Sequence, residues 1–226
     1  MEGGKARAKR SRELKTEDRL QFSIADSEEI SKGVELQLAP FFSSKKYLVY
    51  EYSGPIPVFE IPEGIQYLFL THSKLKDFYE GDSNLFFNKF SRFISLGYIG
   101  LILFQGVTWQ GMAWMSTPSS PPPPHLPLWI KNLNVFWGFY GHTREEYRGK
   151  GLLKLALQIL IKRSIEEGNT FFNDMSIDNI PPRRASLAVG LKPKGVLVTY
   201  HLGVPRIERK LILGRWYKEE EHPPII

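Results

Sequence analysis

A short basic turn, rich in glycine, joins an apolar segment to an amphipathic helix past the middle of the chain. The turn reads Arg-Gly-Lys-Gly over residues 148–151, and residues 152–167 place leucine and isoleucine at helical intervals. The first turn of a helix leaves backbone N–H groups without partners, and glycines let an anion approach them closely. The pattern predicts a strand over residues 133–143, a turn over 144–151 and a helix from residue 152, and the turn itself can hold a phosphate.

Hydrophobic patterning predicts short strands and helices on both sides of the turn. Strands are expected over residues 47–52, 65–70, 98–104, 107–116, 133–143, 171–177, 196–202 and 207–213. Helices are expected from Ser73 through Phe78 and over residues 85–94, 152–167 and 182–189. This order predicts an α/β (α+β) chain built around a sheet.

Composition excludes several classes of protein. The chain has 226 residues and no cysteine, so disulfides, thiolate metal sites and a cysteine nucleophile are excluded. Its five histidines are scattered without ligand spacing, so no metal site is expected. No window holds 18 consecutive apolar residues, so no membrane span is expected, and we expect a cytoplasmic protein.

Basic residues concentrate at the N-terminus. Residues 5–15 carry six basic side chains and one acidic side chain, a net charge of +5 out of +6 for the whole chain. Residues 1–18 are therefore expected to form a disordered basic tail, for which contact with nucleic acid is a weaker alternative. A run of prolines over residues 118–127 cannot pair in a sheet or continue a helix, and it predicts a stiff surface loop.

The turn does not fit two common phosphate motifs. A Walker loop ends in Gly-Lys-Ser/Thr, whereas Gly149-Lys150 is followed by Gly151. A dinucleotide fingerprint needs a third glycine at position 154, which is Lys154. A structural turn with exposed basic side chains stays open as an alternative at this point.

Two segments resemble the GNAT superfamily of N-acetyltransferases. Residues 143–152, Thr-Arg-Glu-Glu-Tyr-Arg-Gly-Lys-Gly-Leu, resemble its strand-then-loop motif, in which Arg/Gln-x-x-Gly-x-Gly/Ala grips the pyrophosphate of coenzyme A. Arg148 matches the first position and Gly151 the fourth, whereas Leu153 replaces the glycine or alanine at the sixth. Residues 179–195 resemble the Asn-x-x-Ser, Gly-Phe and Gly segment, with Pro182 and Leu191 as departures. The resemblance covers about residues 65–202.

This resemblance implies a GNAT fold, with a central mixed, mostly antiparallel twisted sheet flanked by helices and an additional N-terminal strand region. We expect an N-terminal extension over 19–64 that packs on the core, an acyltransferase domain over 65–214 and a C-terminal tail over 215–226. The residues implied to bind acetyl-CoA or another acyl-CoA are Gly141, His142, Thr143, Arg148, Gly149, Lys150, Gly151, Leu152, Leu153 and Asn179.

The implied activity is acetyl transfer from acetyl-CoA to a primary amine by direct attack, without a metal. The acceptor would be a small-molecule or protein amine. Two alternatives remain: a long-chain acyl donor carried by coenzyme A or acyl carrier protein, and a non-catalytic GNAT-like binding module. The oligomeric state is open.

The acid and base of the reaction are less defined. The family's tyrosine acid stands four residues before its Gly-Phe pair, where this chain has Ser186. The candidates by location are His142, Tyr140 and Asp178, with Tyr200 as a further one. Asp174 and Asp178 could bind a cationic amine or merely bound a turn. Six aromatic residues before the turn could line an acceptor pocket or fill the core: Trp109, Trp114, Trp129, Phe136, Trp137 and Tyr140.

Overall fold

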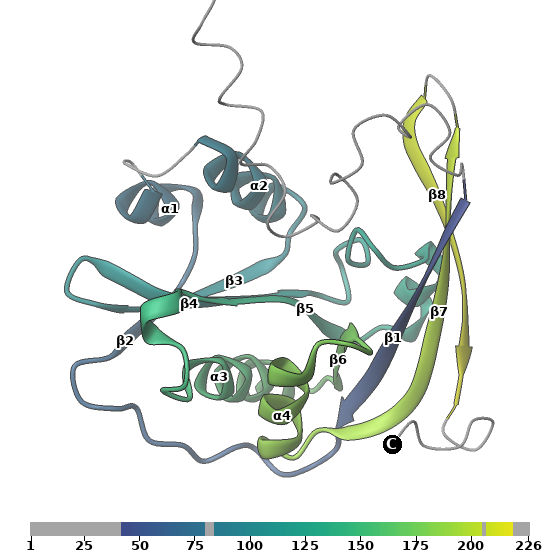
Figure 1. The fold of residues 1–226 in the computed structure, drawn as a ribbon. Coiled ribbons are helices and arrows are strands. Elements are labelled where there is room, and N and C mark those ends of the chain that lie inside the picture. The colour runs from purple at the N-terminus through teal and green to yellow at the C-terminus, as the bar shows by residue number, and fades with distance from the viewer. Residues whose placement is uncertain (1–41, 80–83, 205–206, 219–226) are drawn as a thin grey trace, which may run out of the picture. The chain divides into compact units, whose positions relative to one another are not determined.

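The structure, a computed structural model, describes residues 42–79, 84–204 and 207–218. Its strands form one sheet in the order β2-β3-β4-β5-β6-β1-β7-β8 (Figure 1). The strands are β1 Phe42–Tyr52, β2 Gln66–Phe69, β3 Ile99–Gln105, β4 Thr108–Ser116, β5 Phe136–Thr143, β6 Phe171–Ser176, β7 Lys192–Val204 and β8 Ile207–Tyr217. Neighbouring strands pair antiparallel except β5 and β6, which pair parallel.

Helices cover both faces of the sheet. The helices α1 (His72–Tyr79) and α2 (Asn84–Ser95) lie on one face, and α3 (Leu152–Glu166) and α4 (Ile180–Ala188) lie on the other (Figure 1). Helix α1 begins earlier than Ser73, because the Thr71 hydroxyl accepts the Lys74 N–H at 3.3 Å. Threonine serves this capping role as well as serine does, so the residue pattern alone did not separate the two.

The first strand lies in the interior of the sheet. Tyr47 of β1 is in register with Ser176 of β6 on one side and with Leu197 of β7 on the other. The domain boundary expected at residue 65 would therefore assign β1 to an extension, although β1 is an interior strand of the sheet. Residues 42–52 are part of the core rather than an extension packed on it. The reason is that β1 supplies buried side chains, including Val49 and Tyr50, that the sheet would otherwise lack.

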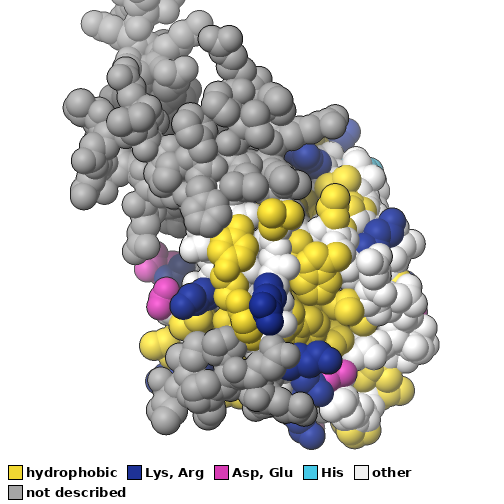
Figure 2. Space-filling model, turned by 90° about the vertical axis from the view of Figure 1, so that its right-hand side faces the viewer, with side chains coloured by type: hydrophobic (Ala, Val, Ile, Leu, Met, Phe, Trp, Pro, Cys, Tyr) yellow, Lys and Arg dark blue, Asp and Glu magenta, His cyan; other side chains and the backbone are white. Residues whose placement is uncertain are grey.

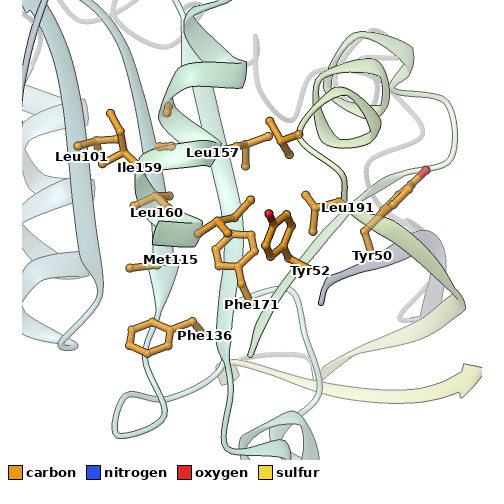
Figure 3. Close-up of a cluster of buried hydrophobic side chains, with 14 of the residues drawn as sticks. Tyr50, Tyr52, Leu101, Met115, Phe136, Leu157, Ile159, Leu160, Phe171 and Leu191 are labelled. Atoms are coloured by element: carbon orange, nitrogen blue, oxygen red, sulfur yellow. The ribbon is translucent and has the colours of Figure 1, made fainter. Parts of the chain in front are cut away.

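Helix α3 packs its apolar stripe on the sheet and forms the largest core cluster. Leu160 and Ile161 have no exposed surface, and the rings of Phe171 and Tyr52 lie side by side beneath the helix (Figure 3). Burying a leucine or isoleucine side chain stabilises a fold by roughly 1.5–3 kcal/mol. This packing fixes where the helix begins, and so fixes the turn that precedes it.

The proline-rich loop does not lie on the surface as the sequence predicted. Pro122 and Pro123 are buried, and the Tyr98 hydroxyl donates a hydrogen bond of 2.8 Å to the Pro122 carbonyl. Leu126 is 3% exposed and packs with Trp137 in a second face of the core. A proline run needs no donors for its own backbone, so it can be buried more cheaply than an ordinary loop.

The C-terminal part of the described chain is a long hairpin of β7 and β8. Strand β8 continues to Tyr217, so the expected tail over 215–226 begins inside a strand, and the Trp129 indole donates to the Gly214 carbonyl at 3.1 Å. On this side of the molecule, Lys and Arg side chains border hydrophobic ones, and acidic side chains are few (Figure 2). The expected basic tail over 1–18 lies outside the described residues. None of the helices in the described ranges is long and apolar enough to cross a membrane.

Candidate functional site

The strands β5 and β6 pair over only three residues and then part. Phe136, Trp137 and Gly138 are in register with residues 171–173 of β6, and the rest of β5 has no partner on that side. The separation begins at Phe139, which is the extra residue of a bulge between β5 and β4. Bulges bend a strand and often lie beside functional sites. The bend opens the sheet between two parallel strands, on the side of their carboxyl ends.

Backbone groups of β5 face this opening. The Arg144 N–H donates to Gln110 of β4 at 2.9 Å, so the peptide groups in step with it, including His142, face β4. Because peptide groups alternate between the two edges of a strand, those of Gly141 and Thr143 face the opening. The three backbone positions expected from the sequence are therefore divided: Gly141 and Thr143 face the open edge, and His142 faces its neighbour strand.

The basic turn lies at the end of this open edge. Gly149 and Gly151 have φ angles of 78° and 75°, a region that L-residues rarely adopt. An added Cβ at either glycine would meet no atom within 4 Å, so the space beside the turn is open. Gly151 is the N-cap of α3 and no side chain caps the helix. The N–H groups of the first turn of α3 therefore have no side-chain cap, and they directly follow Arg148 and Lys150 in the sequence.

Those side chains are exposed and only loosely held. Arg148 Nε lies 3.4 Å from the Thr143 carbonyl, and its guanidinium lies 3.6 Å from a Glu145 carboxylate oxygen. Lys150 Nζ lies 4.9 Å from the centre of the Tyr147 ring. Exposed contacts of this kind contribute little to folding, so both cations can turn toward an anion at low cost.

Leu153 departs from the family motif, and the structure shows how the chain accommodates it. A Cβ added to Gly141 would lie 2.8 Å from Leu153 Cδ1. The larger side chain at the helix start therefore occupies space that Gly141 leaves on the facing strand. Gly141 is unusual within a strand, and Leu153 is unusual in the motif. The two residues pack against each other, so one arrangement accounts for both departures.

Asp178 and Asn179 follow the end of β6. Asn179 is the N-cap of α4, its N–H donates to the Ser176 carbonyl at 3.0 Å, and its side chain makes no capping bond. Both side chains are exposed. Because β5 and β6 are parallel, these residues and the basic turn lie at the same edge of the sheet, where open α/β sheets bind ligands.

Tyr140 and His142 lie on the opposite face, toward α2. Lys89 Nζ lies 4.4 Å from the centre of the Tyr140 ring, and burial raises the pKa of the Tyr140 hydroxyl. Burial also lowers the pKa of His142, and the charges of Arg148, Lys89 and Arg144 lower it further. Near neutral pH, Tyr140 therefore keeps its proton and His142 is uncharged.

A second histidine was missed by the sequence analysis. His125, in the proline-rich loop, lies with Nε2 2.8 Å from a carboxylate oxygen of Asp174 on β6. The other oxygen of Asp174 accepts the Trp137 indole N–H at 2.6 Å. Asp174 was expected only as a binder of a cationic amine or as a turn residue. Nothing in the sequence joins residues 49 positions apart, although an isolated histidine within a proline run was an available signal.

Comparison with known proteins identifies the fold. No family model matches the chain, and no curated protein matches it in sequence. Solved structures do match: a Drosophila protein at TM-score 0.51 and 11% identity, over 74% of this chain and 53% of that one, and a GCN5-related N-acetyltransferase-like protein of Streptococcus suis at 0.49 and 14%, over 74% and 65%. An acetyltransferase of the GNAT family from Colwellia psychrerythraea matches at 0.50 and 12%, over 67% of this chain and 53% of its own length.

The chain has a GNAT fold. The expected mixed, mostly antiparallel sheet flanked by helices is confirmed, and it matches the GNAT acetyltransferase of Colwellia psychrerythraea at 12% identity. The chain spans between about half and two thirds of the length of the three neighbours described above. A likeness at this identity defines the fold and leaves the chemistry to the residues.

Two further residues singled out from the sequence, Ser186 and Tyr200, occupy different places relative to the opening between β5 and β6. Ser186 is fully buried in α4, and its hydroxyl accepts a hydrogen bond of 3.2 Å from Asn173. Tyr200 lies on β7, in register with Ser44 and Leu213. Ser186 therefore bonds the β6 residue at which the strands part, but it is fully buried, whereas Tyr200 is separated from β6 by β1.

Most of the aromatic residues fill the core. Trp114, Phe136 and Trp137 are at most 1% exposed, and Trp114 stacks on Phe90 at 5.2 Å between ring centres. Trp109 is half-buried, under the Arg144 guanidinium at 5.1 Å. Only Trp109 and Tyr140 of this group thus combine partial exposure with a position near the end of β5. In the described part of the chain, His, Asp and Glu side chains nowhere gather in threes as a metal ion would require.

Proposed function

We propose that this chain is an acyl-CoA-dependent N-acyltransferase that transfers an acetyl group from acetyl-CoA to a primary amine. One observation carries the proposal: the open edge of β5 is followed by an exposed turn with two positive-φ glycines and two cations, and by a helix whose N-terminus has no side-chain cap. A diphosphate attached to a long, hydrogen-bonding arm matches this arrangement. The GNAT fold supports the same reading.

The residues present fit coenzyme A. The amides at the start of α3, together with Arg148 and Lys150, would hold the diphosphate, and a helix N-terminus stabilises an exposed anion by about 0.3–1 kcal/mol. The Gly141 and Thr143 peptide groups would hydrogen-bond the pantetheine arm as an additional strand does, and Asn179 would reach it from β6. The acceptor, a small-molecule or protein amine, would approach from the face that carries Tyr140 and His142.

When bound, acetyl-CoA supplies an activated thioester carbonyl. The chain must remove a proton from the acceptor, which is charged at neutral pH, and stabilise negative charge that develops on the carbonyl oxygen. The Gly141 N–H, which faces the opening, is a backbone donor that could stabilise this oxygen. Metal chemistry is not required for either task.

The test of the proposal is a pair of matched glycine variants on one helix. Gly151 and Gly168 have φ angles of 75° and 74°, both without atoms near an added Cβ, and they lie at opposite ends of α3. Gly151→Glu and Gly168→Glu therefore introduce similar backbone strain, but only the first places a carboxylate in the proposed diphosphate site. Coenzyme A at 100 times its Kd should stabilise the wild-type chain and Gly168→Glu by about 2.7 kcal/mol.

We expect Gly151→Glu to lose most of this stabilisation while unfolding with the same cooperativity as Gly168→Glu. Thermal unfolding with acetyl-CoA, a long-chain acyl-CoA and coenzyme A measures it and separates a short acyl donor from a long one. Equal stabilisation of both variants would show that the diphosphate binds elsewhere. Amine-dependent release of free thiol from acetyl-CoA then separates an enzyme from a binding module.

A further inference from the structure

A loop histidine and a buried aspartate meet beside the place where β5 leaves β6. The last register pair of the two strands is Gly138 with Asn173, and Asp174 is the next residue of β6. The Asp174 side chain is on the face away from α3, because it accepts the indole N–H of Trp137. His125 Nε2 contacts its second oxygen at 2.8 Å. The pair therefore lies at the edge of the opening, on the side from which the acceptor would come.

The geometry of the pair is fixed. The Asp174 side chain is 2% exposed, so its carboxylate depends on the two N–H donors that reach it. His125 is held in turn by the Leu126 N–H, which donates to the Pro123 carbonyl at 2.9 Å around the histidine, and by the burial of Leu126. The His125 ring also lies against Tyr47 of β1, with ring centres 5.0 Å apart. These contacts hold the ring in one orientation without any ligand.

Hydrogen bonding to Asp174 determines which nitrogen of His125 can take a proton. A carboxylate only accepts, so in the neutral ring Nε2 carries the proton and Nδ1 carries the lone pair. A quarter of the His125 side chain is exposed, so the ring remains accessible. The titratable groups that face it are Asp174 on β6 and Tyr47 on β1. An imidazolium formed there would be paired with the Asp174 carboxylate.

His142 has the opposite surroundings. Three cationic side chains, Arg148, Lys89 and Arg144, act against a positive charge on its ring, and its pKa is lowered. A group that must accept a proton from an ammonium is disfavoured by nearby cations and favoured by a nearby carboxylate. Of the two histidines, His125 is the one whose ring is hydrogen-bonded to a carboxylate.

We propose that His125 is the general base that deprotonates the acceptor amine, and that Asp174 is the positioning residue that holds its tautomer. This inference rests on the proposed acyltransferase function. His125 Nδ1 takes one proton from the acceptor ammonium, which frees the nitrogen lone pair. That nitrogen then forms a bond to the thioester carbonyl carbon, the carbon–sulfur bond breaks, and the second nitrogen proton passes to the leaving thiolate. The products are an N-acetyl amine, free thiol and a proton that His125 returns to solvent.

Kinetics on the full chain tests the base. The readout is free-thiol release from acetyl-CoA with a panel of primary alkyl amines and with hydroxylamine, which is already unprotonated at neutral pH. We expect His125→Gln to lower kcat about 100-fold with alkyl amines at pH 7 but less than about threefold with hydroxylamine. The loss should shrink as pH rises, because the acceptor then deprotonates without a base. His72→Ala is the control, since this exposed histidine lies on α1 and hydrogen-bonds the Ser91 and Ser95 hydroxyls of α2.

A measurement without turnover tests the geometry. Two-dimensional ¹H–¹⁵N spectra of the histidine rings should show the His125 proton on Nε2 in the wild-type chain. Asp174→Asn keeps an oxygen for the Trp137 indole but offers His125 an N–H, so the proton should move to Nδ1 and kcat should fall as in His125→Gln. Unaltered coenzyme A stabilisation in both variants would show that they are folded and that the diphosphate site is separate.

The outcomes are distinguishable. Thiol release that His125→Gln leaves intact, or that falls equally with alkyl amines and hydroxylamine, would overturn the base while leaving the acyltransferase function standing. A wild-type His125 that carries its proton on Nδ1 would do the same. Absence of amine-dependent thiol release from the wild-type chain with every amine would overturn the proposed function and this inference with it.

Discussion

The two segments that flank β5 are held in different ways. The proline-rich loop before the strand is buried, with Leu126 in the core and the Pro122 carbonyl bonded to Tyr98. The turn after the strand is exposed, with glycines at which an added Cβ would meet no atom within 4 Å and with cations that are loosely paired. The loop therefore contributes to stability and positions His125, whereas the turn contributes little to stability and remains available to a ligand. Substitutions in the two segments should separate folding from binding.

The largest expected effect is on folding, at Leu126 in the loop. Leu126→Ala removes a side chain that is 3% exposed and should lower the free energy of unfolding by about 2–5 kcal/mol. Leu128→Ala, two residues further and 77% exposed, is the control and should change it by less than about 0.5 kcal/mol. Urea denaturation of both variants measures the difference. Similar stabilities would mean that the loop is not anchored as described.

The next effect is on binding, at Arg148 in the turn. Under the proposed function, Arg148→Ala should weaken coenzyme A binding roughly tenfold, about 1.4 kcal/mol, and reduce the salt dependence of binding. The free energy of unfolding should stay within about 0.5 kcal/mol of wild type, because the side chain is exposed. Arg163→Ala, at the other end of α3, is the control for calorimetric titration. A large loss of stability in Arg148→Ala would remove the contrast between turn and loop.

A smaller effect on folding is expected at Tyr98. Its hydroxyl is buried, its pKa is raised to about 12 by burial, and it donates to the Pro122 carbonyl. Tyr98→Phe should therefore lower the free energy of unfolding by about 1 kcal/mol, with the exposed Tyr67→Phe as control. Denaturation at neutral pH, where Tyr98 is protonated, measures it. If Tyr98→Phe matches the control, the loop is held by its apolar contacts alone.

The smallest effect is electrostatic, at the junction of β5 and the turn. The pKa of His142 is below its ordinary 6.5, so the unfolded chain takes up a proton at higher pH than the folded chain. The contribution of His142 to stability is therefore present above about pH 6.5 and is lost as pH falls below it. Arg148→Ala should raise the pKa of His142, and coenzyme A should raise it too by neutralising Arg148. Histidine ring NMR signals followed against pH measure both changes in the pKa of His142. An unchanged pKa in Arg148→Ala would mean that the Arg148 guanidinium does not lie close to His142.

The sequence predicted correctly those features that depend on residues close together in the chain. The order of strands and helices, the turn over 148–151 and the helix after it follow from local patterns, and their bounds differ from the structure by a few residues. The glycine geometry of the turn was also foreseeable, because only glycine adopts such φ angles readily. Which residues bind or react stays a prediction.

Features that depend on long-range pairing could not be foreseen. No local pattern places β1 between β6 and β7, and none brings His125 to Asp174. The proline run was interpreted from backbone propensity alone. Propensity shows that prolines cannot pair in a sheet or continue a helix, but it does not show which surface their side chains bury. The same limit applies to Leu153, whose place against Gly141 depends on two elements packing together.

The interior position of β1 also determines the order in which the protein can be completed on the ribosome. β1 is translated before both of its partner strands. Tyr47 can pair with Ser176 only after β6 has been made, and Phe42 can pair with Leu202 only after β7 has been made. Contacts so distant along the chain slow folding, since the ends of a long loop must meet before they gain anything. Until β7 has been translated, the nascent chain exposes the unpaired edges of two strands. A chaperone that binds such edges could act during most of the translation of the chain.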